Sequence, residues 1–289
     1  MTLTDDLTAL REGHAWVDRS DRGFVTVTGP DTFSFLQAIV SADLDPLADG
    51  DAVHSLLLAP QGKLDVDFRL VRVGPEEAWL DCAPGVGAQL AASLTRFRIR
   101  VKADIVDRSG ELGMLSHIGD EVGGDVVVTP EGVHRIPTTW GFDLVGPRRA
   151  LPAVAPLVDP VAFEAWRIEQ GIPVQPFDLD DSTIPQEAFL EQDAVSFTKG
   201  CFIGQELVCR IDSRGHVNRF LRTFTQIDGD WPPVGAEVVV DGKVVGALTS
   251  VAPPELPTAA LGYVRREVEP PTSVELRWDG GRAVAVIQR

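Results

Sequence analysis

The segment Ser196-Phe197-Thr198-Lys199-Gly200-Cys201-Phe202-Ile203-Gly204-Gln205-Glu206 is the most unusual stretch of this 289-residue chain. Two glycines enclose a cysteine, and the residues that follow resemble the opening of a helix. A cysteine just before a helix N-terminus, with a lysine two residues away, has its thiolate favoured by the helix dipole and by the lysine charge. Cys201 is therefore a candidate nucleophile or redox group, with Lys199 as its partner. A small buried cysteine in a tight glycine turn is the alternative, and from chemistry alone it is favoured.

A group of arginines follows this segment in a chain that is otherwise acidic. Its members, with Asp212 and His216 between them, are Arg210, Arg214, Arg219 and Arg222. Guanidinium groups bind carboxylates or phosphates through paired hydrogen bonds, so the group could hold an anionic ligand. Ion pairs with the surplus acids account for the same arginines equally well, because such pairs are common and individually weak. Both interpretations stay open here.

The clearest strand in the sequence carries two carboxylates on one face. Side chains alternate with a period of two, with Leu64, Val66, Phe68 and Leu70 on one face and Asp65, Asp67 and Arg69 on the other. The apolar face is expected to pack on a core. Two acids on one strand face can do acid–base chemistry when they are desolvated. A solvated sheet face is the simpler alternative.

Two further positions suggest a pocket for a ring-shaped ligand. Phe163 and Trp166 lie three residues apart on a helix that Asp159 and Pro160 open, so one could line a pocket while the other packs in the core. Glu187, which shortly precedes the apolar pair Phe189-Leu190, could lie in a cleft.

Composition disfavours several classes of function. The 43 acids against 26 bases give a net charge of -17, which argues against nucleic acid as the main partner. The three cysteines, Cys82, Cys201 and Cys209, are too few for a disulfide framework, and no metal-ligand spacing occurs among the cysteines and histidines. No stretch approaches the ~20 apolar residues of a membrane helix, and residues 1–11 lack the apolar run of a secretory signal. We therefore expect a cytoplasmic protein with no membrane partner.

The order of elements predicts an α+β fold. Strands at 24–27, 53–58, 64–70 and 99–106 alternate irregularly with helices from about residues 31 and 84. Prolines between residues 150 and 160 mark a connection to the helix at 160–170, which Gly171 ends. From about residue 221 a hairpin with an Asp241-Gly242 turn and further short strands predict a small β-barrel. The expected parts are 1–150, 151–220 and 221–289.

The segment Lys199–Glu206 resembles the signature K-G-C-F/Y-x-G-Q-E of the YgfZ-type folate-binding proteins. These are relatives of the glycine cleavage T protein, an aminomethyltransferase. Arg167–Pro173 resembles the R-x-E-x-G-x-P segment of the same proteins, and Ile184–Glu187 resembles their I-P-Q-E segment. The stretch Gly29–Leu36 and the turn Gln61–Lys63 also fit, so the resemblance runs from about residue 22 to about residue 222.

This resemblance implies a three-lobed aminomethyltransferase-like fold, with two α+β lobes and a C-terminal β-barrel around a central folate pocket. It further implies tetrahydrofolate, or a derivative, as the cofactor, and a role in making or repairing iron–sulfur proteins, which would be the partners. Cys201 and Lys199 are then the functional pair. The expected folate contacts are Asp65, Asp67, Phe163, Glu187, Gln205, Glu206 and Arg210.

Two departures from the T-protein pattern keep other functions open. T proteins have a Gly-Gly turn before two adjacent aspartates, whereas Val66 separates Asp65 from Asp67 here. Some family members have tryptophan where this chain has Arg22 and Phe163. The candidates are an iron–sulfur accessory factor, an aminomethyltransferase, and a folate-binding scaffold without chemistry. The first requires an exposed, reactive Cys201, and the last predicts a buried one.

Overall fold

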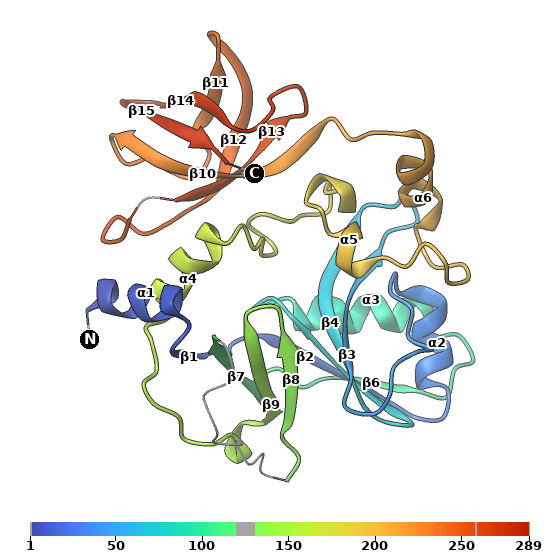
Figure 1. Ribbon diagram of the computed structural model, residues 1–289. Helices are drawn as coiled ribbons and strands as arrows, with labels where there is room; N and C mark the ends of the chain where they lie inside the picture. Colours follow the sequence, from blue (N-terminus) through green and yellow to red (C-terminus); the bar gives the residue numbers. More distant parts are fainter. Residues whose placement is uncertain (1, 120–130, 258, 289) are drawn as a thin grey trace.

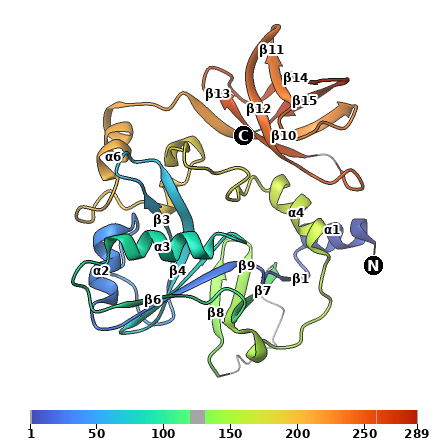
Figure 2. The ribbon, with the colours of Figure 1, turned by 180° about the vertical axis from the view of Figure 1, so that it is seen from behind.

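Two β-sheets, a closed β-barrel and the helices that join them make up the computed structural model, which describes residues 2–119, 131–257 and 259–288 (Figure 1). The barrel lies above the two sheets in this view, and the connecting helices lie between them. Helix α6 lies at the opposite end of the molecule from α1, as the reverse view also shows (Figure 2). The α+β architecture with a C-terminal barrel, predicted from the sequence, is confirmed.

The first sheet is five-stranded, in the order β3 (Ala52–Leu58), β4 (Leu64–Gly74), β5 (Glu77–Cys82), β2 (Gly23–Thr28) and β6 (Asp104–Asp107). Helices α2 (Thr32–Ile39) and α3 (Gly87–Phe97) cover one face of this sheet. On that face Val66, Phe68 and Leu70 of β4 pack against Leu36 of α2 and Leu90 of α3. The alternation in β4 therefore places Val66, Phe68 and Leu70 on the predicted core face. Leu64, predicted on the same face, packs instead with Leu58 in the core that contains Trp166, because the strand gains one residue between Leu64 and Val66.

Two predicted boundaries in this region are wrong. Helix α3 begins at Gly87 instead of near Pro84, because Gly85 has φ +79° and a left-handed residue cannot continue a right-handed helix. The strand predicted over 99–106 is reduced to β6. Arg100, with φ +59°, turns the chain there, and Ile99 is 76% exposed.

The second sheet has the order β1 (Ala15–Asp18), β7 (Leu112–Ile118), β9 (Gly141–Pro147) and β8 (His134–Thr138). Helix α1 (Leu3–Glu12) precedes it, and the 3-10 turn η1 (Arg148–Ala150) follows it. Thr2 is the N-cap of this helix, and its side chain forms a reciprocal capping box with Asp5. Phe24 and Trp79 of the first sheet pack against Met114 and Val145 of the second, so two sheets share one apolar interface.

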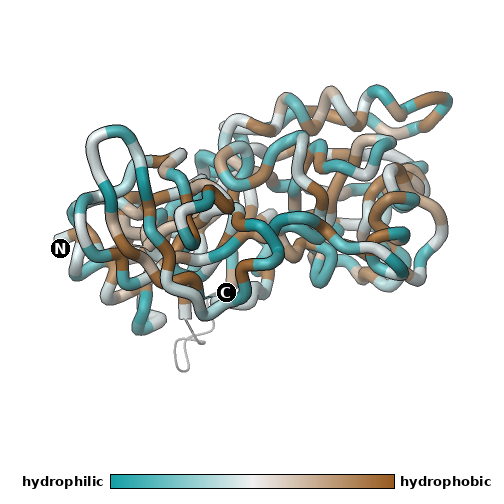
Figure 3. The backbone as a smooth tube through the Cα atoms, turned by 90° about the horizontal axis from the view of Figure 1, so that it is seen from above, coloured by the Kyte–Doolittle hydropathy of each residue, from teal (hydrophilic) through white to brown (hydrophobic). Residues whose placement is uncertain are grey.

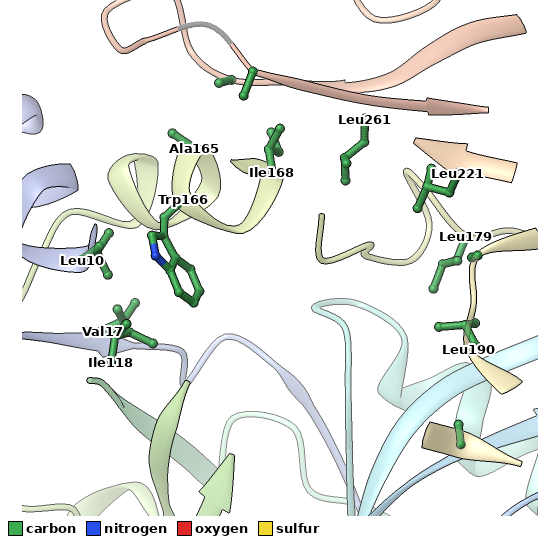
Figure 4. Close-up of a cluster of buried hydrophobic side chains, with 14 of the residues drawn as sticks. Leu10, Val17, Ile118, Ala165, Trp166, Ile168, Leu179, Leu190, Leu221 and Leu261 are labelled. Atoms are coloured by element: carbon green, nitrogen blue, oxygen red, sulfur yellow. The ribbon is translucent and has the colours of Figure 1, made fainter. Parts of the chain in front are cut away.

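The connecting segment holds α4 (Pro160–Glu169), η2 (Pro185–Glu187), α5 (Glu191–Ala194) and α6 (Gln205–Arg214). The side chain of Asp159 accepts a hydrogen bond from the Val161 amide, which confirms the N-cap predicted for α4. Trp166 and Ile168 of α4 belong to a core that also contains Leu10 of α1 and Leu261 of the barrel (Figure 4). Helix α4 therefore joins the N-terminal lobe to the barrel.

The barrel closes in the order β10 (Arg219–Gly229), β13 (Ala260–Arg265), β12 (Lys243–Val251), β11 (Glu237–Val240), β14 (Thr272–Trp278) and β15 (Gly281–Ile287). Asp241 and Gly242, between β11 and β12, have φ of +50° and +76°, as the predicted type I′ turn requires. Phe224, Leu248 and Leu276 fill the interior. The division of the chain at residues 150 and 220 stays a prediction.

Apolar segments are short along the part of the backbone that is coloured by hydropathy (Figure 3). Within residues 2–119, 131–257 and 259–288, no helix is long and apolar enough to cross a membrane.

Candidate functional site: a central cavity and an outer cysteine loop

A cavity of about 1260 Å³ lies where the two sheets, α4 and the barrel meet. Its wall combines residues 17–22, strands β3, β4, β5, β9 and β10, helix α4, and the segments 170–175 and 188–193. Small-molecule sites typically enclose about 300–1,000 Å³, so this cavity has room for an extended ligand. No single lobe forms it alone.

Buried ion pairs form one wall of the cavity. Arg69 of β4 donates from Nε to Asp81 at 2.9 Å and from Nη1 to Asp143 at 2.6 Å, which ties the two sheets together. Arg22 donates to the other oxygen of Asp81 at 2.8 Å. Burial alone would raise the pKa of the Asp81 carboxyl, but Arg69 and Arg22 outweigh it and hold that pKa below its ordinary value. These ion pairs hold the side chains of this wall in fixed positions before any ligand binds.

A third cation lies against the aromatic part of the cavity. The guanidinium of Arg19 stands 5.0 Å from the centroid of the Phe163 ring and 5.9 Å from that of Trp140. Burial, followed by repulsion from Arg22, lowers the pKa of Arg19 to about 10. Phe163 lines the cavity, whereas Trp166 is 5% exposed and packs in the core behind it. The two aromatic residues of α4 thus divide the roles of wall and core between them.

A histidine–aspartate pair lies on the sheet wall of the cavity. The Nε2 atom of His54 in β3 is 2.5 Å from Oδ1 of Asp67 in β4, and both residues line the cavity. Asp65 does not join them. It is the extra residue of a β-bulge, because Leu57 pairs with Val66 and Leu58 pairs with Leu64. The prediction that Asp65 and Asp67 share a face is therefore wrong.

The carboxylate of Asp65 instead contacts α3. Its oxygens accept hydrogen bonds from Gln89 at 3.1 Å and from Arg96 at 3.0 Å, outside the cavity wall. Gln175 holds the bulge in place, because its side chain donates to the Asp65 carbonyl and accepts from the Asp67 amide. The side-chain amide thus replaces the ladder bonds that the bulge interrupts.

The downstream arginines separate into paired and unpaired residues. Arg210 pairs with Glu206 on the exposed face of α6, and Arg219 pairs with the buried Glu187 at 3.0 Å. Neither these two arginines nor the two glutamates line the cavity. Arg222 of β10 does line it, and within the part of the chain that the structure describes its buried Nε has no hydrogen-bond partner.

Two phenylalanines hold Arg222 in this position. Its guanidinium lies 4.9 Å from the ring centroid of Phe220 and 5.6 Å from that of Phe189, and these two rings are stacked. Burial, with no compensating acid, lowers the pKa of Arg222. Phe189 has φ +60°, a strained value for a non-glycine residue. The arrangement leaves a guanidinium available to an anionic group in the cavity.

Cys201 lies outside the cavity wall, on the loop between α5 and α6, and it is exposed. Lys199 does not contact it. The Lys199 ammonium donates to the carbonyl oxygens of Gln37, Val40 and Ala42 at 2.7–2.8 Å, and so caps the C-terminal end of α2. Burial lowers the pKa of Lys199 to about 8. Lys199 therefore anchors the loop that presents the cysteine.

The glycines of the two sequence motifs meet beneath this loop. Gly204 has φ +78°, and a Cβ there would lie 2.6 Å from the carbonyl oxygen of Ala59. A Cβ at Gly62 would lie 2.9 Å from the carbonyl oxygen of Gly204. The turn between β3 and β4 thus packs directly against the start of α6, where Gln205 and Glu206 lie. Gln205, like Glu206, is absent from the cavity wall.

The sequence analysis missed most of the cations of the cavity as site residues. Arg19 and Arg22 lie far in sequence from Arg69. Arg69 carried a signal, because the alternation in β4 placed it on the face of Asp67, and Arg22 was noted only as a position where some family members have tryptophan. Asp143 carried no signal. Among residues 2–119, 131–257 and 259–288, no group of three or more histidines, cysteines or acids gathers to hold a metal ion.

The sequence of this chain is similar to two groups of known proteins. The family described as the GCVT N-terminal domain matches residues 2–121. An iron–sulfur cluster assembly factor IBA57 homolog from Chaetomium globosum is 28% identical over 78% of this chain, which spans 59% of that protein's length. The tRNA-modifying protein YgfZ of Serratia proteamaculans is 29% identical, over 77% of this chain and 74% of its own.

Aminomethyltransferases are similar over nearly the whole chain. That of Rippkaea orientalis is 27% identical, over 98% of this chain and 88% of its own. The crystal structure of the glycine cleavage system aminomethyltransferase T from Bartonella henselae superposes with a TM-score of 0.82 and 20% identity, over 99% of this chain and 88% of the other. At that identity the superposition shows a shared fold.

Proposed function

This chain is a relative of the YgfZ-type proteins and of the aminomethyltransferases, and we propose that it binds a tetrahydrofolate in the central cavity and supports the assembly or repair of iron–sulfur proteins. The iron–sulfur part of the proposal draws on the name of the IBA57 relative. The net charge of -17 disfavours direct contact with RNA, so the proposal does not extend to tRNA binding.

The chemistry of the cavity carries the folate part of the proposal. A folate combines a flat heteroaromatic ring with an anionic tail. The cavity offers an aromatic wall at Phe163 and Trp140, hydrogen-bonding groups at His54 and Asp67, and an unpaired guanidinium at Arg222. An unpaired guanidinium that is partly buried is costly unless an anion compensates it, even in a chain with 17 more acids than bases.

The outer loop carries the second part of the proposal. Exposure of Cys201 removes the expectation of a buried structural thiol, and anchoring by Lys199 fixes the loop on the protein surface. We place Cys201 at the contact with an iron–sulfur client, on a surface separate from the folate cavity. Folate binding and thiol chemistry are then two sites of one protein.

Calorimetric titration with tetrahydrofolate, under anaerobic and reducing conditions, tests the first site. We expect saturable binding by the wild-type protein and roughly tenfold weaker binding by Arg222→Gln, because a charged hydrogen bond is worth about 1.5–3 kcal/mol. Arg277→Gln is the matched control, since Arg277 pairs with Glu237 on the outer surface of the barrel. Absence of binding by the wild-type protein would refute the proposal that the central cavity binds tetrahydrofolate.

Activity of iron–sulfur enzymes in cells that depend on this protein tests the second site. Cys201→Ser should lower that activity, whereas Cys209→Ser, at a half-buried position on α6, should not. Full activity with Cys201→Ser would refute the role of the thiol.

An aminomethyltransferase function is the second candidate, favoured by the similarity of that enzyme over 98% of the chain. Its test is the formation of ammonia and a one-carbon folate from tetrahydrofolate and an aminomethylated lipoyl carrier protein. Turnover in this assay would favour the second candidate over the first. Folate binding without turnover would favour the accessory role.

A further inference from the structure

The histidine–aspartate pair of the cavity has features that folate binding alone does not require. His54 and Asp67 lie on neighbouring antiparallel strands, where His54 is directly opposite Arg69 and Leu56 is directly opposite Asp67. They are therefore diagonal neighbours on one face of the sheet, turned away from α2 and α3. Their side chains are 35% and 25% exposed, so a ligand in the cavity can reach them.

The charges around His54 favour its protonated form. Burial by itself lowers the pKa of the imidazole, but Asp67, Asp193 of α5 and Asp81 of β5 outweigh burial and raise that pKa above its ordinary value. Arg69 on β4 also faces this part of the cavity, with both its ion pairs directed at Asp81 and Asp143. These carboxylates therefore favour the imidazolium form of His54, which adds a positive charge to the cavity.

Only one oxygen of Asp67 is engaged by the protein. Oδ1 contacts His54, the backbone amide donates to Gln175, and within the described residues Oδ2 makes no hydrogen bond. Gln175 is 6% exposed and fixed by its bond to the Asp65 carbonyl, so the backbone that carries Asp67 is held firmly. The free oxygen is an acceptor for a donor that the protein does not supply.

We propose that His54 and Asp67 form a proton-controlled grip on the cavity ligand, in which protonated His54 orients Asp67 and Oδ2 of Asp67 accepts a hydrogen bond from a ring N–H of the ligand. His54 is a positioning residue and Asp67 is a binding residue. This inference rests on the proposed function, because it takes a folate as the ligand.

The grip makes binding depend on pH with a definite sign. Below the pKa of His54, the imidazolium and the Asp67 carboxylate form a neutral pair that faces an anionic ligand. Above it, the imidazole is neutral and the same site carries a net negative charge beside Asp81 and Asp193. Affinity for an anionic ligand should therefore fall as pH rises. By reciprocity the ligand raises the pKa of His54, and each unit of that rise corresponds to about a tenfold loss of affinity at high pH.

The test is the affinity for tetrahydrofolate, measured from pH 6 to pH 9 in four proteins. The wild-type protein and the control His216→Gln, an exposed residue outside the cavity wall, should lose affinity with rising pH. His54→Gln can still donate to Asp67 but cannot titrate, so its profile should be flatter. Asp67→Asn should bind more weakly at every pH. Titration of the folate itself is common to all four proteins and cancels in the comparison.

Two results would overturn the inference in distinguishable ways. A His54→Gln profile that retains the slope of the wild-type protein would refute the grip while leaving folate binding intact. No binding by the wild-type protein at any pH would refute the proposed function and the grip together. As a second readout, the imidazole signal of His54 in an NMR titration should shift to a higher pKa on folate addition, and to a lower pKa in Asp67→Asn.

Discussion

Lys199 and Cys201 lie two residues apart in the sequence and perform separate tasks in the structure. The side chain of Lys199 turns inward to the end of α2, whereas Cys201 points to solvent. Two of the three carbonyls that the ammonium contacts, those of Gln37 and Val40, belong to the end of α2, where the last carbonyls of a helix have no intrahelical donor. The pattern Lys-Gly-Cys thus describes an anchored loop, and the lysine contributes to it through backbone geometry.

Replacement of Lys199 by methionine should therefore destabilise the protein. We expect a loss of about 2 kcal/mol in the free energy of unfolding, because three hydrogen bonds to a charged donor are removed from a half-buried site. The measurement is urea denaturation at pH 7. Lys243→Met, at the exposed first position of β12, is the control and should stay within about 0.5 kcal/mol of the wild-type protein. Equal stability of the two variants would contradict the anchoring role.

The same variant gives a pH dependence of defined sign. The pKa of Lys199 is about 8 in the folded protein and 10.5 in an unperturbed lysine, so the unfolded chain binds more protons between these values. Folding stability from this residue therefore rises with pH in that window. The stability difference between the wild-type protein and Lys199→Met should be larger at pH 9.5 than at pH 7. A stability difference that becomes smaller from pH 7 to pH 9.5 would show that burial does not lower the pKa of Lys199.

Cys201 and Cys82 should differ in their reactivity toward an alkylating reagent. Burial raises the pKa of the Cys82 thiol to about 12, and Cys82 is fully buried behind Gly23, whereas Cys201 is exposed. Thiolate formation and access both control alkylation. Brief treatment of the native protein with iodoacetamide at pH 8 should label Cys201 and leave Cys82 unmodified, as peptide mass spectrometry would show. Labelling of Cys82 before unfolding would contradict this packing.

The elements themselves were predictable where local pattern and burial agree. Alternation identified β4, and Asp159-Pro160 identified the start of α4. The bulge at Asp65 was not predictable, because it depends on Gln175, which is distant in sequence and supplies the missing hydrogen bonds. A strict period of two cannot show where a strand gains one residue. Strict alternation wrongly placed Asp65 on the face of Asp67, whereas the bulge turns its carboxylate toward α3.

The junction of the β3–β4 turn with α6 depends on a glycine that has no room for a side chain. Gly204→Ala would force a Cβ against Ala59 at a left-handed φ, so we expect a loss of at least about 2 kcal/mol in unfolding free energy. Gly200→Ala is the matched control on the same loop, since a Cβ there meets nothing within 4 Å. The measurement is chemical denaturation of both variants. Similar midpoints for the two would show that the backbone around Gly204 can shift to accommodate a Cβ at little cost, and would contradict the prediction.

At the scale of the whole molecule, the cavity exists because three distant parts of the chain meet. Strand β4 supplies Asp67, α4 supplies Phe163, and β10 of the barrel supplies Arg222. Local patterns predicted the barrel and the helix. Their arrangement around a central pocket followed only from the family resemblance, because it depends on buried polar contacts between residues that no local pattern connects. Arg19 was missed as a site residue for the same reason, whereas Arg222 belonged to the arginine group that the sequence offered for an anionic ligand. The fold was thus more predictable than the site.

Asp178 joins the barrel to α4 and to the connecting segment. Its two oxygens accept hydrogen bonds from Arg167 at 2.8 Å, from the Val174 amide at 3.1 Å, and from the hydroxyls of Thr249 and Ser250 at 2.5 and 2.7 Å. The carboxylate is fully buried, and Arg167 is nearly so. Removal of one member of such a pair leaves the other charge buried without compensation.

We therefore expect Asp178→Asn to lower the unfolding free energy by about 3 kcal/mol, at the lower end of the range for broken buried pairs because Glu164 still contacts Arg167. The barrel should also loosen from α4, so limited proteolysis should cut within 170–183 sooner than in the wild-type protein. Asp228→Asn, exposed at the far end of β10, keeps the same change of charge without the contacts and should behave as the wild-type protein does. If both variants unfold alike and resist proteolysis alike, the barrel is held by apolar packing around Trp166 and Leu261, and the polar contacts of Asp178 add little to it.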